Sequence, residues 1–294
     1  PESQAVQITH DAAGNADAVL YLDAEGNLHR QAAKAVCVAG NSIESPRLLL
    51  LSASSMFPDG LANSSGQVGR NYMRHLTGSV YARFDKPVHM YRGETMAGII
   101  ADEQPHDPSR GFVGGYYMET LALGPSFLAS FADPGAWGAD FTEIMDAYSH
   151  TAGMWIVGED MPQSSNRVTL SSSKRDKWDI PAANVHYDDH KNDLAMRAHA
   201  YEKATKLYES VGSTGRQLTP PYPSTHNLGT LRMSANAEDG VLNNYGRAHD
   251  VKNLFVSDGS VMTTGASANP TLTIVALAIR QAEYLAKQLK SGEL

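Results

Sequence analysis

Near the end of the chain, a run of small residues leads into a predicted helix, and this point could bind an anion. Residues 263–268 contain only Thr, Gly, Ala and Ser, Asn269 and Pro270 follow, and residues 271–290 have a helical pattern. Asn before Pro is typical of a helix start, so Asn269 is expected to cap this helix. The first N–H groups of a helix have no partner within it, so an anionic oxygen of a phosphate or of an electron-rich ring could bind there. Many helices begin in this way and bind nothing, so the pattern alone assigns no function.

The order of strand, turn and helix occurs twice in the sequence. Residues 254–256 form a short apolar strand before this C-terminal loop, and residues 35–39 form an earlier apolar strand that ends at Gly40. After the earlier strand, Ser45 and Pro46 predict the cap and first position of a helix over 47–52. A strand that is apolar on both faces is typical of a parallel sheet covered on both sides. The two units therefore predict an α/β domain of the kind that binds nucleotides.

In the C-terminal helix, alanines recur every four residues and predict a face that packs closely on the sheet (Ala278, Ala282 and Ala286).

The middle of the chain has a different pattern. From residue 76 to residue 224, β-rich segments alternate with polar or glycine-rich loops, and residues 191–211 predict a helix with Leu194 on its apolar stripe. Strands followed by a covering helix predict an α+β domain. The proline-rich residues 219–223 predict a stiff connector back to the first domain.

Composition excludes several functions. The 294 residues carry 24 Lys and Arg against 32 Asp and Glu, a net charge of −8, and no basic cluster, which argues against nucleic acid as a partner. No segment approaches the roughly 18 apolar residues of a membrane span, and no targeting signal is visible. The single cysteine, Cys37, excludes an internal disulfide, and its apolar neighbours predict a buried, unreactive thiol. His186 and His190 resemble metal ligands, but we prefer a hydrated polar turn there and expect no metal.

Three ordered motifs carry a resemblance to a known family. They are AGNSIESPRLLLLS at 39–52, HNLGTLRM at 226–233, and the segment 258–273 with DGSV at its start and NPTLT at its end. The segments QVGRN at 67–71 and NRVTL at 166–170 fit the same pattern. With these motifs the sequence resembles the glucose-methanol-choline (GMC) family of flavin-dependent alcohol oxidoreductases over nearly its whole length. It departs from the family where Asn41 replaces Gly or Ser and where Ala53 replaces Gly.

The resemblance implies a fold in two parts. Residues 1–77 and 225–294 are expected to form an α/β, Rossmann-like FAD-binding domain, and residues 78–224 an inserted α+β substrate-binding domain. The chain has no strand followed by Gly-x-Gly-x-x-Gly, so we expect the FAD domain to be incomplete. The N-terminal remainder would come from the same gene product or from another chain. Without it, we expect these residues neither to fold stably nor to bind FAD.

The resemblance also implies roles for individual residues. His226 matches the family's catalytic histidine, and Asn269 the second active-site position. The remaining matches are to FAD-binding positions: Val6 at the adenine, Ala39 and Gly40 at the ADP half, Asp258 and Gly259 at the ribityl-pyrophosphate portion, and Pro270 and Thr271 at the pyrimidine edge of the flavin.

These roles agree with the chemistry of alcohol oxidation, which removes a proton from oxygen and a hydride from carbon. A neutral imidazole suits the proton, so we expect His226 to accept it, Asn269 to hydrogen-bond the same oxygen, and flavin N5 to receive the hydride. The aromatic residues Tyr116, Tyr117 and Trp155 fit either a sugar-stacking pocket or the protein core.

The branch of the family that the motifs resemble most contains sugar and polyol dehydrogenases, with pyranose oxidases as further relatives. It implies a sugar or other alcohol as substrate, and an electron-transfer partner if oxygen is not the acceptor. Only this branch resemblance favours a periplasmic or secreted location. Two other functions stay open, a hydroxynitrile lyase-like use of the scaffold without net redox chemistry and a non-catalytic binding or assembly subunit.

Overall fold

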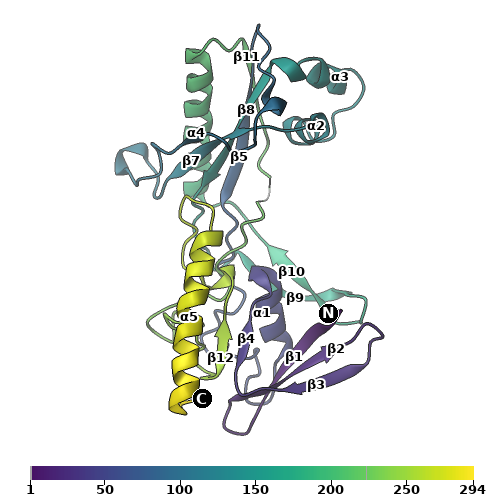
Figure 1. The fold of residues 1–294 in the computed structure, drawn as a ribbon, viewed down its shortest axis with the longest axis vertical. Coiled ribbons are helices and arrows are strands. Elements are labelled where there is room, and N and C mark those ends of the chain that lie inside the picture. Colours follow the sequence, from purple (N-terminus) through teal and green to yellow (C-terminus); the bar gives the residue numbers. More distant parts are fainter. Residues whose placement is uncertain (1, 223) are drawn as a thin grey trace.

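A computed structural model describes residues 2–222 and 224–294, which form two lobes joined by a narrower waist (Figure 1). The chain begins in the lower lobe with an antiparallel meander of β1 (Gln4–His10), β2 (Ala16–Leu22) and β3 (Leu28–Ala32). Asp residues form both turns of the meander: Asp11 accepts the backbone N–H of Ala13 and Asn15, and Asp23 accepts those of Glu25 and Asn27. Such local bonds replace the ladder bonds that end at a turn.

The predicted apolar strands of the lower lobe pair with each other. Strand β4 (Val36–Val38) lies parallel to β12 (Leu254–Val256), with Val36 opposite Leu254. The pairing is parallel, as the apolar pattern of residues 35–39 indicated, although that pattern did not identify the partner strand. The prediction of a buried thiol is wrong, because Cys37 is exposed and its Sγ donates to Oε1 of Gln281 at 3.4 Å. Its neighbours Val36 and Val38 point to the buried side instead.

Helix α1 (Asn41–Leu51) begins earlier than its sequence predicts. Pro46 was expected at the first position but lies inside the helix, where it has no N–H to donate to the Ser42 carbonyl four residues earlier. That carbonyl instead accepts a hydrogen bond from Oγ1 of Thr230 at 2.8 Å. A distant side chain thus replaces the missing helical bond, which explains why the proline is tolerated. Ser45 is not the predicted cap, because it lies inside the helix, where its hydroxyl accepts the Gly40 N–H at 2.9 Å and donates to Asp258.

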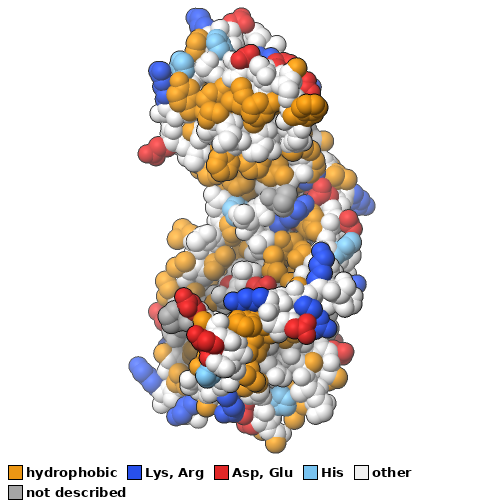
Figure 2. Space-filling view, turned by 90° about the vertical axis from the view of Figure 1, so that its right-hand side faces the viewer, with side chains coloured by type: hydrophobic (Ala, Val, Ile, Leu, Met, Phe, Trp, Pro, Cys, Tyr) orange, Lys and Arg blue, Asp and Glu red, His pale blue; other side chains and the backbone are white. Residues whose placement is uncertain are grey.

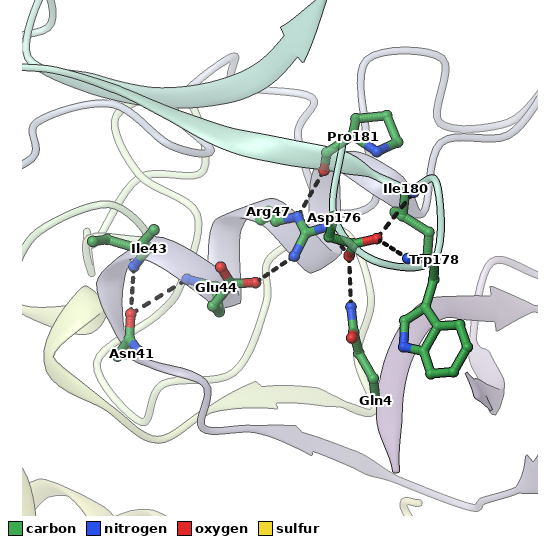
Figure 3. A network of polar contacts seen from close by, with 9 residues as sticks. All are labelled: Gln4, Asn41, Ile43, Glu44, Arg47, Asp176, Trp178, Ile180 and Pro181. Atoms are coloured by element: carbon green, nitrogen blue, oxygen red, sulfur yellow. Dashed lines mark hydrogen bonds and ion pairs between the residues drawn. The ribbon is translucent and has the colours of Figure 1, made fainter. Parts of the chain in front are cut away.

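A two-stranded hairpin, β9 (Arg167–Arg175) and β10 (Pro181–His186), packs against α1. The contact centres on the buried guanidinium of Arg47, shown in Figure 3. It donates to the Pro181 carbonyl at 2.8 Å and forms ion pairs with Asp176 at 2.7 Å and Glu44 at 2.9 Å. Burial disfavours the charge of Asp176, but hydrogen bonds from Arg47 and Gln4 outweigh this and lower the pKa of its carboxyl. The hairpin is therefore fixed to the first helix, although it lies between the segments of the upper lobe in sequence.

The upper lobe is built on a five-stranded sheet. Its order is β11-β5-β8-β7-β6, and all pairings are antiparallel. The strands are β5 (Leu76–Arg83), β6 (Ile99–Ile100), β7 (Tyr116–Leu121), β8 (Thr151–Gly158) and β11 (Gly215–Leu218). The helices are α2 (Pro125–Ala132), α3 (Ala139–Asp146) and α4 (Lys191–Ser210), with short 3-10 turns at Met90–Arg92, Pro108–Arg110 and Tyr148–His150. Figure 1 shows α4 on one side of the sheet and α2 and α3 on the other.

Alternation along the strands gives the sheet two different faces. Val80, Met118 and Ile156 point to α4 and form a buried core with its Met196 and Ala200. Leu194, predicted on the packed stripe, is 52% exposed, because the stripe that meets the sheet begins at Met196 instead. The intervening residues of β5, β7 and β8 face away from α4, and they include several polar or aromatic side chains: Thr77, Ser79, Tyr117, Glu119 and Trp155.

The chain ends with helix α5 (Thr271–Ser291), which runs down the lower lobe from the waist (Figure 1). The predicted alanine face does not pack on a sheet, since Ala282 and Ala286 are exposed. The helix is held by buried Gln281, whose amide donates to the Val256 carbonyl at 2.6 Å, and by Tyr284, which stacks on Tyr245. Within the described residues, no helix is both long and apolar enough to cross a membrane. In Figure 2 the molecule narrows between the lobes, with apolar side chains on either side of the waist.

Candidate active site

The loop that carries His226 lies between two other segments and is fixed to both by backbone hydrogen bonds. Leu228 exchanges two bonds with Met73, at 2.9 and 3.0 Å. On the other side, N–H groups of the loop donate to residues 259–261, beginning with the bond from Gly229 to the Gly259 carbonyl. A Cβ on Gly259 would lie 2.7 Å from the Asn227 carbonyl oxygen, so only glycine permits this approach. The backbone around His226 is therefore fixed before any ligand binds.

His226 is paired with a second histidine that the sequence did not single out. Its Nδ1 lies 2.9 Å from Nδ1 of His75, and Nε2 of His75 lies 2.8 Å from the Gly265 carbonyl oxygen. A carbonyl only accepts, so Nε2 of His75 carries the proton and its Nδ1, in the neutral ring, is an acceptor. Nδ1 of His226 must then donate, and Nε2 of His226 keeps a free lone pair. The pair thus fixes the tautomer in which His226 can act as a base.

Both rings are held neutral. Burial lowers the pKa of His226 to about 4, and the neighbouring His75 adds to this shift. Burial also lowers the pKa of His75, whose side chain is enclosed more completely. A neutral His226 can accept a proton at physiological pH, whereas a charged one could not.

The backbone at His75 is strained and is held by a buried carboxylate. His75 has a φ of 59°, in the left-handed region that non-glycine residues seldom adopt. Asp160 accepts the N–H of Arg74 at 2.8 Å and that of His75 at 3.1 Å. Burial raises the pKa of Asp160, because the backbone N–H groups only partly offset the cost of removing the carboxylate from water. A Cβ on Gly265 would lie 2.8 Å from the His75 ring, so glycine is needed there for the ring to reach its carbonyl partner.

Asn269 does not cap α5 as predicted. Pro270 is the residue before the helix, and no side chain caps it. The Asn269 amide reaches toward the upper lobe instead, where its Oδ1 accepts from the Tyr117 hydroxyl at 3.0 Å and its Nδ2 donates to Oε1 of Glu119 at 3.4 Å. The tyrosine donor fixes the orientation of the amide, because only the oxygen of the amide can accept.

The His226 and Asn269 side chains both lie beside residues of the upper-lobe sheet. The Trp155 ring lies 6.0 Å from the His226 ring, centroid to centroid, and Trp155 is directly opposite Glu119 in the pairing of β7 with β8. Tyr117 and Trp155 therefore belong to the site, whereas Tyr116 lies in the core under α4, with its hydroxyl 2.9 Å from Nδ1 of His199. Of the three aromatic candidates, two thus lie beside the proposed catalytic residues and one lies in the core under α4.

The buried carboxylate of Asp258 joins the two strand-turn-helix units. Its Oδ2 accepts from the backbone N–H of Asn41 at 3.0 Å and from the hydroxyl of Ser45, and its Oδ1 accepts from the backbone and hydroxyl of Ser260. Asn41 has a φ of 71°, a conformation that asparagine tolerates better than most residues, which explains how it stands where Gly is expected. The four donors fix the turns that follow β4 and β12.

The other predicted FAD-binding residues lie in several places. Ala39 and Gly40 are exposed directly after β4, and Gly259 is buried at the start of the 3-10 turn Gly259–Val261 that follows β12. Pro270 and Thr271 lie at the uncapped start of α5. Val6 is half-buried in β1, at an irregularity in its pairing with β2.

The polar turn before α4 has a structural role. His190 and Asp193 form a capping box, in which the His190 ring accepts the Asn192 N–H and Asp193 accepts the His190 N–H. His186 is exposed and pairs only with Asp188, at 3.0 Å. Nowhere in residues 2–222 and 224–294 do three or more His, Cys, Asp or Glu side chains gather as a metal site would require.

The chain is similar in sequence to known proteins. Residues 162–278 match the family model described as GMC oxidoreductase. The chain is 36% identical to 2-methyl-1,2-propanediol dehydrogenase of Mycolicibacterium austroafricanum, over 96% of this chain and 53% of that protein. It is 28% identical to the fructose dehydrogenase large subunit of Gluconobacter japonicus, over 99% of this chain and 54% of that protein. The chain thus spans about half the length of the curated relatives it matches.

Solved structures show the same fold. A variant of formate oxidase from Aspergillus oryzae superposes with a TM-score of 0.70 at 16% identity, over 99% of this chain and 61% of that one. Pyridoxine 4-oxidase gives 0.64 at 20% identity, over 97% of this chain and 57% of that one. The chain belongs to the GMC oxidoreductase family.

Proposed function

We propose that the protein oxidises an alcohol with FAD as cofactor, and that His226 is the base. The observation that carries the proposal is the pair of imidazoles, which leaves Nε2 of His226 unprotonated and free to accept. A base must be neutral and correctly oriented before its substrate arrives, and this pair supplies both conditions. The chain's membership of a flavoenzyme family supports the same chemistry.

The residues present fit FAD. Helix α5 has no side-chain cap, so the N–H groups of its first turn are open to an anionic oxygen or an electron-rich ring. Leu272 in that turn is 81% exposed, as expected for an apolar side chain that a ligand or another segment covers. Gly40 and the Asp258 turn lie at the ends of two parallel strands, where α/β folds bind nucleotides. We propose that Val6, Ala39, Gly40, Asp258, Gly259, Pro270 and Thr271 belong to this site.

The same placement supports two functional domains. We propose that residues 1–77 and 225–294 form part of a Rossmann-like FAD-binding domain and that residues 78–224 form the substrate-binding domain. The parallel pair β4 and β12 supports the first assignment. The second is supported by Tyr117 and Trp155, which extend from the upper sheet toward Asn269 and His226.

The chain's own groups act on the alcohol as follows. Nε2 of His226 accepts the hydroxyl proton as the C–H bond breaks, and the second N–H of the Asn269 amide donates to the same oxygen. His75 keeps Nδ1 of His226 hydrogen-bonded, so the ring does not rotate as it becomes charged. FAD, when bound, supplies the acceptor for the hydride. The carbon is oxidised to a carbonyl, and its two electrons leave with the hydride.

We propose a sugar or another polyol as the substrate. The relatives named above act on a diol and on fructose, according to their names, and a further relative is the gluconate 2-dehydrogenase flavoprotein of Pantoea cypripedii, 27% identical over 93% of this chain and 48% of that protein. If oxygen is not the acceptor, a separate electron-transfer partner takes the electrons.

Anaerobic reduction of the holoenzyme tests the proposal. A sugar or polyol should bleach the yellow colour of the flavin, and His226→Ala should slow bleaching by about 10²–10⁴-fold while FAD stays bound. His186→Ala, which removes an exposed histidine in β10, is the matched control and should bleach at the normal rate. Near-normal bleaching in His226→Ala would remove His226 from the mechanism. A yellow protein indifferent to every alcohol would favour a lyase, and a colourless one that cannot take up FAD would indicate a binding subunit.

A further inference from the structure

The buried acid Glu119 belongs to the site, but the scheme above gives it no role. Its side chain is 2% exposed, on the face of the upper sheet that points away from α4. It lies two residues from Tyr117 on the same face and directly opposite Trp155 on the neighbouring strand. Both neighbours belong to the site, so Glu119 faces the substrate position rather than the core.

One oxygen of this carboxyl group has no partner. Oε1 accepts a single long hydrogen bond from the Asn269 amide, at 3.4 Å, while Oε2 is buried without a hydrogen-bond partner of good geometry among the described residues. The Tyr117 hydroxyl, which donates to Asn269, lies near enough to Glu119 to oppose the rise that burial causes in the pKa of its carboxyl. A buried polar atom in this state is costly, and native proteins keep it chiefly where a ligand or function requires it. No ion pair with Glu119 occurs in the described part of the chain to offset the cost.

The Asn269 amide determines which ligand group can reach Oε2. Its Oδ1 is occupied by the Tyr117 hydroxyl, and one N–H of its Nδ2 points to Glu119. An amide nitrogen has two N–H groups, so the second can donate to the oxygen that is oxidised. The same amide nitrogen then contacts both the reacting oxygen and the Glu119 carboxyl group. A second substrate group can therefore reach Glu119 only if it lies close to the reacting hydroxyl.

We propose that Oε2 of Glu119 binds a second hydroxyl group of the substrate, on the carbon next to the one that is oxidised. The protein would thereby select vicinal diols, including sugars, over simple alcohols. This assignment rests on the proposed function, because it takes the His226 and Asn269 site as the place of oxidation.

A hydroxyl fits this position better than an ammonium group. Burial raises the pKa of Glu119, and its polar neighbours Tyr117 and Asn269 only partly oppose the shift. A carboxyl oxygen accepts from a hydroxyl whether or not the group is protonated, whereas an ammonium group needs an ionised partner. An amino alcohol is therefore the appropriate competing ligand in a test.

The binding of ligands that cannot be oxidised separates this proposal from the proposed function. 2,3-Dimethylbutane-2,3-diol and 2,3-dimethylbutan-2-ol share a skeleton and have no hydrogen on the carbon that bears the hydroxyl. Titration of the oxidised holoenzyme with each, followed by the change in flavin absorbance, gives two dissociation constants. We expect the diol to bind at least 30-fold more tightly, because a site built around a hydroxyl rejects the analogue that lacks it.

Two variants assign the preference to Glu119. Glu119→Leu should reduce the ratio of the two dissociation constants to within about threefold, since the apolar side chain cannot replace the carboxyl oxygen. Glu119→Gln keeps the shape and an oxygen acceptor, and it should retain most of the preference. An equal loss of affinity for both ligands in Glu119→Leu would show a merely structural role and overturn the proposal.

Other outcomes are also decisive. Equal binding of the diol and the mono-alcohol by the wild-type holoenzyme would overturn the proposal, as would tighter binding of 3-amino-2,3-dimethylbutan-2-ol than of the diol. If instead the diol preference and its loss in Glu119→Leu are seen but propane-1,2-diol and sugars never bleach the flavin, the hydroxyl site stands and the proposed oxidation fails.

Discussion

The Nδ1 atoms of His75 and His226 lie 2.9 Å apart, and only one of the two can carry a proton. The Gly265 carbonyl resolves which one, since it binds the other nitrogen of His75 and leaves His75 as the acceptor. The tautomer of His226 is therefore set by a backbone oxygen through an intervening ring. This hydrogen bond and the contacts that hold the surrounding loops can be tested in four ways. Two tests concern catalysis, one concerns stability and one concerns cofactor binding.

Without the acceptor at Nδ1 of His75, the fold should no longer determine which nitrogen of His226 carries the proton. We expect His75→Leu to slow flavin reduction in the holoenzyme by about 10–100-fold, the usual cost of losing a group that orients an imidazole ligand or base. His75→Asn keeps an acceptor near the position of Nδ1 and should lose less than the leucine variant. Stopped-flow measurement of flavin bleaching gives both rates, and equal rates for the two variants would show that hydrogen bonding at Nδ1 is irrelevant.

The pH dependence of flavin reduction should reflect the lowered pKa of His226. The neutral form is the base, and its pKa is about 4, so protonation removes the base only as the pH falls toward that value. The limiting rate should therefore stay level from pH 8 to pH 5.5, where an ordinary histidine with a pKa of about 6.5 would already have lost most of its activity. Anaerobic bleaching at a series of pH values measures this, and an inflection near 6.5 would contradict a buried, neutral His226.

The Thr230 hydroxyl should stabilise the protein, because it supplies the hydrogen bond to Ser42 that Pro46 cannot donate. Thr230→Val leaves the Ser42 carbonyl buried without a donor, because the proline four residues later has no N–H. We expect a loss of about 1–3 kcal/mol in the free energy of unfolding, measured by urea denaturation of the holoenzyme. Thr230→Ser keeps the hydroxyl and is the control. A valine variant as stable as wild type would mean that water replaces the threonine.

An amide at position 258 should not be able to make the hydrogen bonds of the Asp258 carboxylate. In Asp258→Asn, one of the two oxygens that face N–H and O–H donors becomes an NH₂ group, so donors oppose each other at Asn41 or at Ser260. Because these turns are part of the proposed cofactor site, we expect weaker retention of FAD, by at least tenfold in dissociation constant. Asp250→Asn, which alters a carboxylate that accepts from Ser64 at the surface, should leave retention unchanged. Normal retention in Asp258→Asn would show that the turns hold their shape without this charge.

Local sequence patterns predicted several elements because local forces form them. The apolar run at residues 35–39 marked β4, and Asn-Pro marked the start of α5 to within one residue. The start of α1 was wrong because Pro46 is an unfavourable interior residue on local grounds. It is tolerated because Thr230, 188 positions from Ser42, supplies the hydrogen bond that the Ser42 carbonyl would otherwise lack. The alanine face of α5 was wrong because Gln281, not alanine, provides the contact with β12.

The candidate site was predicted in part. The resemblance identified His226 and Asn269, but the sequence gave no reason to select His75, whose role arises from a contact 151 positions away. Asn269 was expected to bond locally as a cap, and tertiary contact with Tyr117 prevents this. Glu119 could have been found, because alternation along the strand places it on the face of Tyr117, and an acid among apolar strand residues is a signal in itself.

The pairing of β4 with β12 also has a consequence for folding, because it joins segments that are far apart in the sequence. All elements of the upper lobe lie between these two strands in the sequence, so this parallel pair closes a loop that contains the entire upper lobe. The antiparallel sheet of that lobe uses a shorter stretch of chain and can form first, as contacts between nearer residues generally do. During synthesis, β4 and α1 must therefore wait, with Pro46 unsupported, until residues beyond 230 have left the ribosome. The pairing of His75 with His226 spans 151 positions and lies within the same loop, so the candidate base is positioned only when both ends of the upper lobe have returned to the waist.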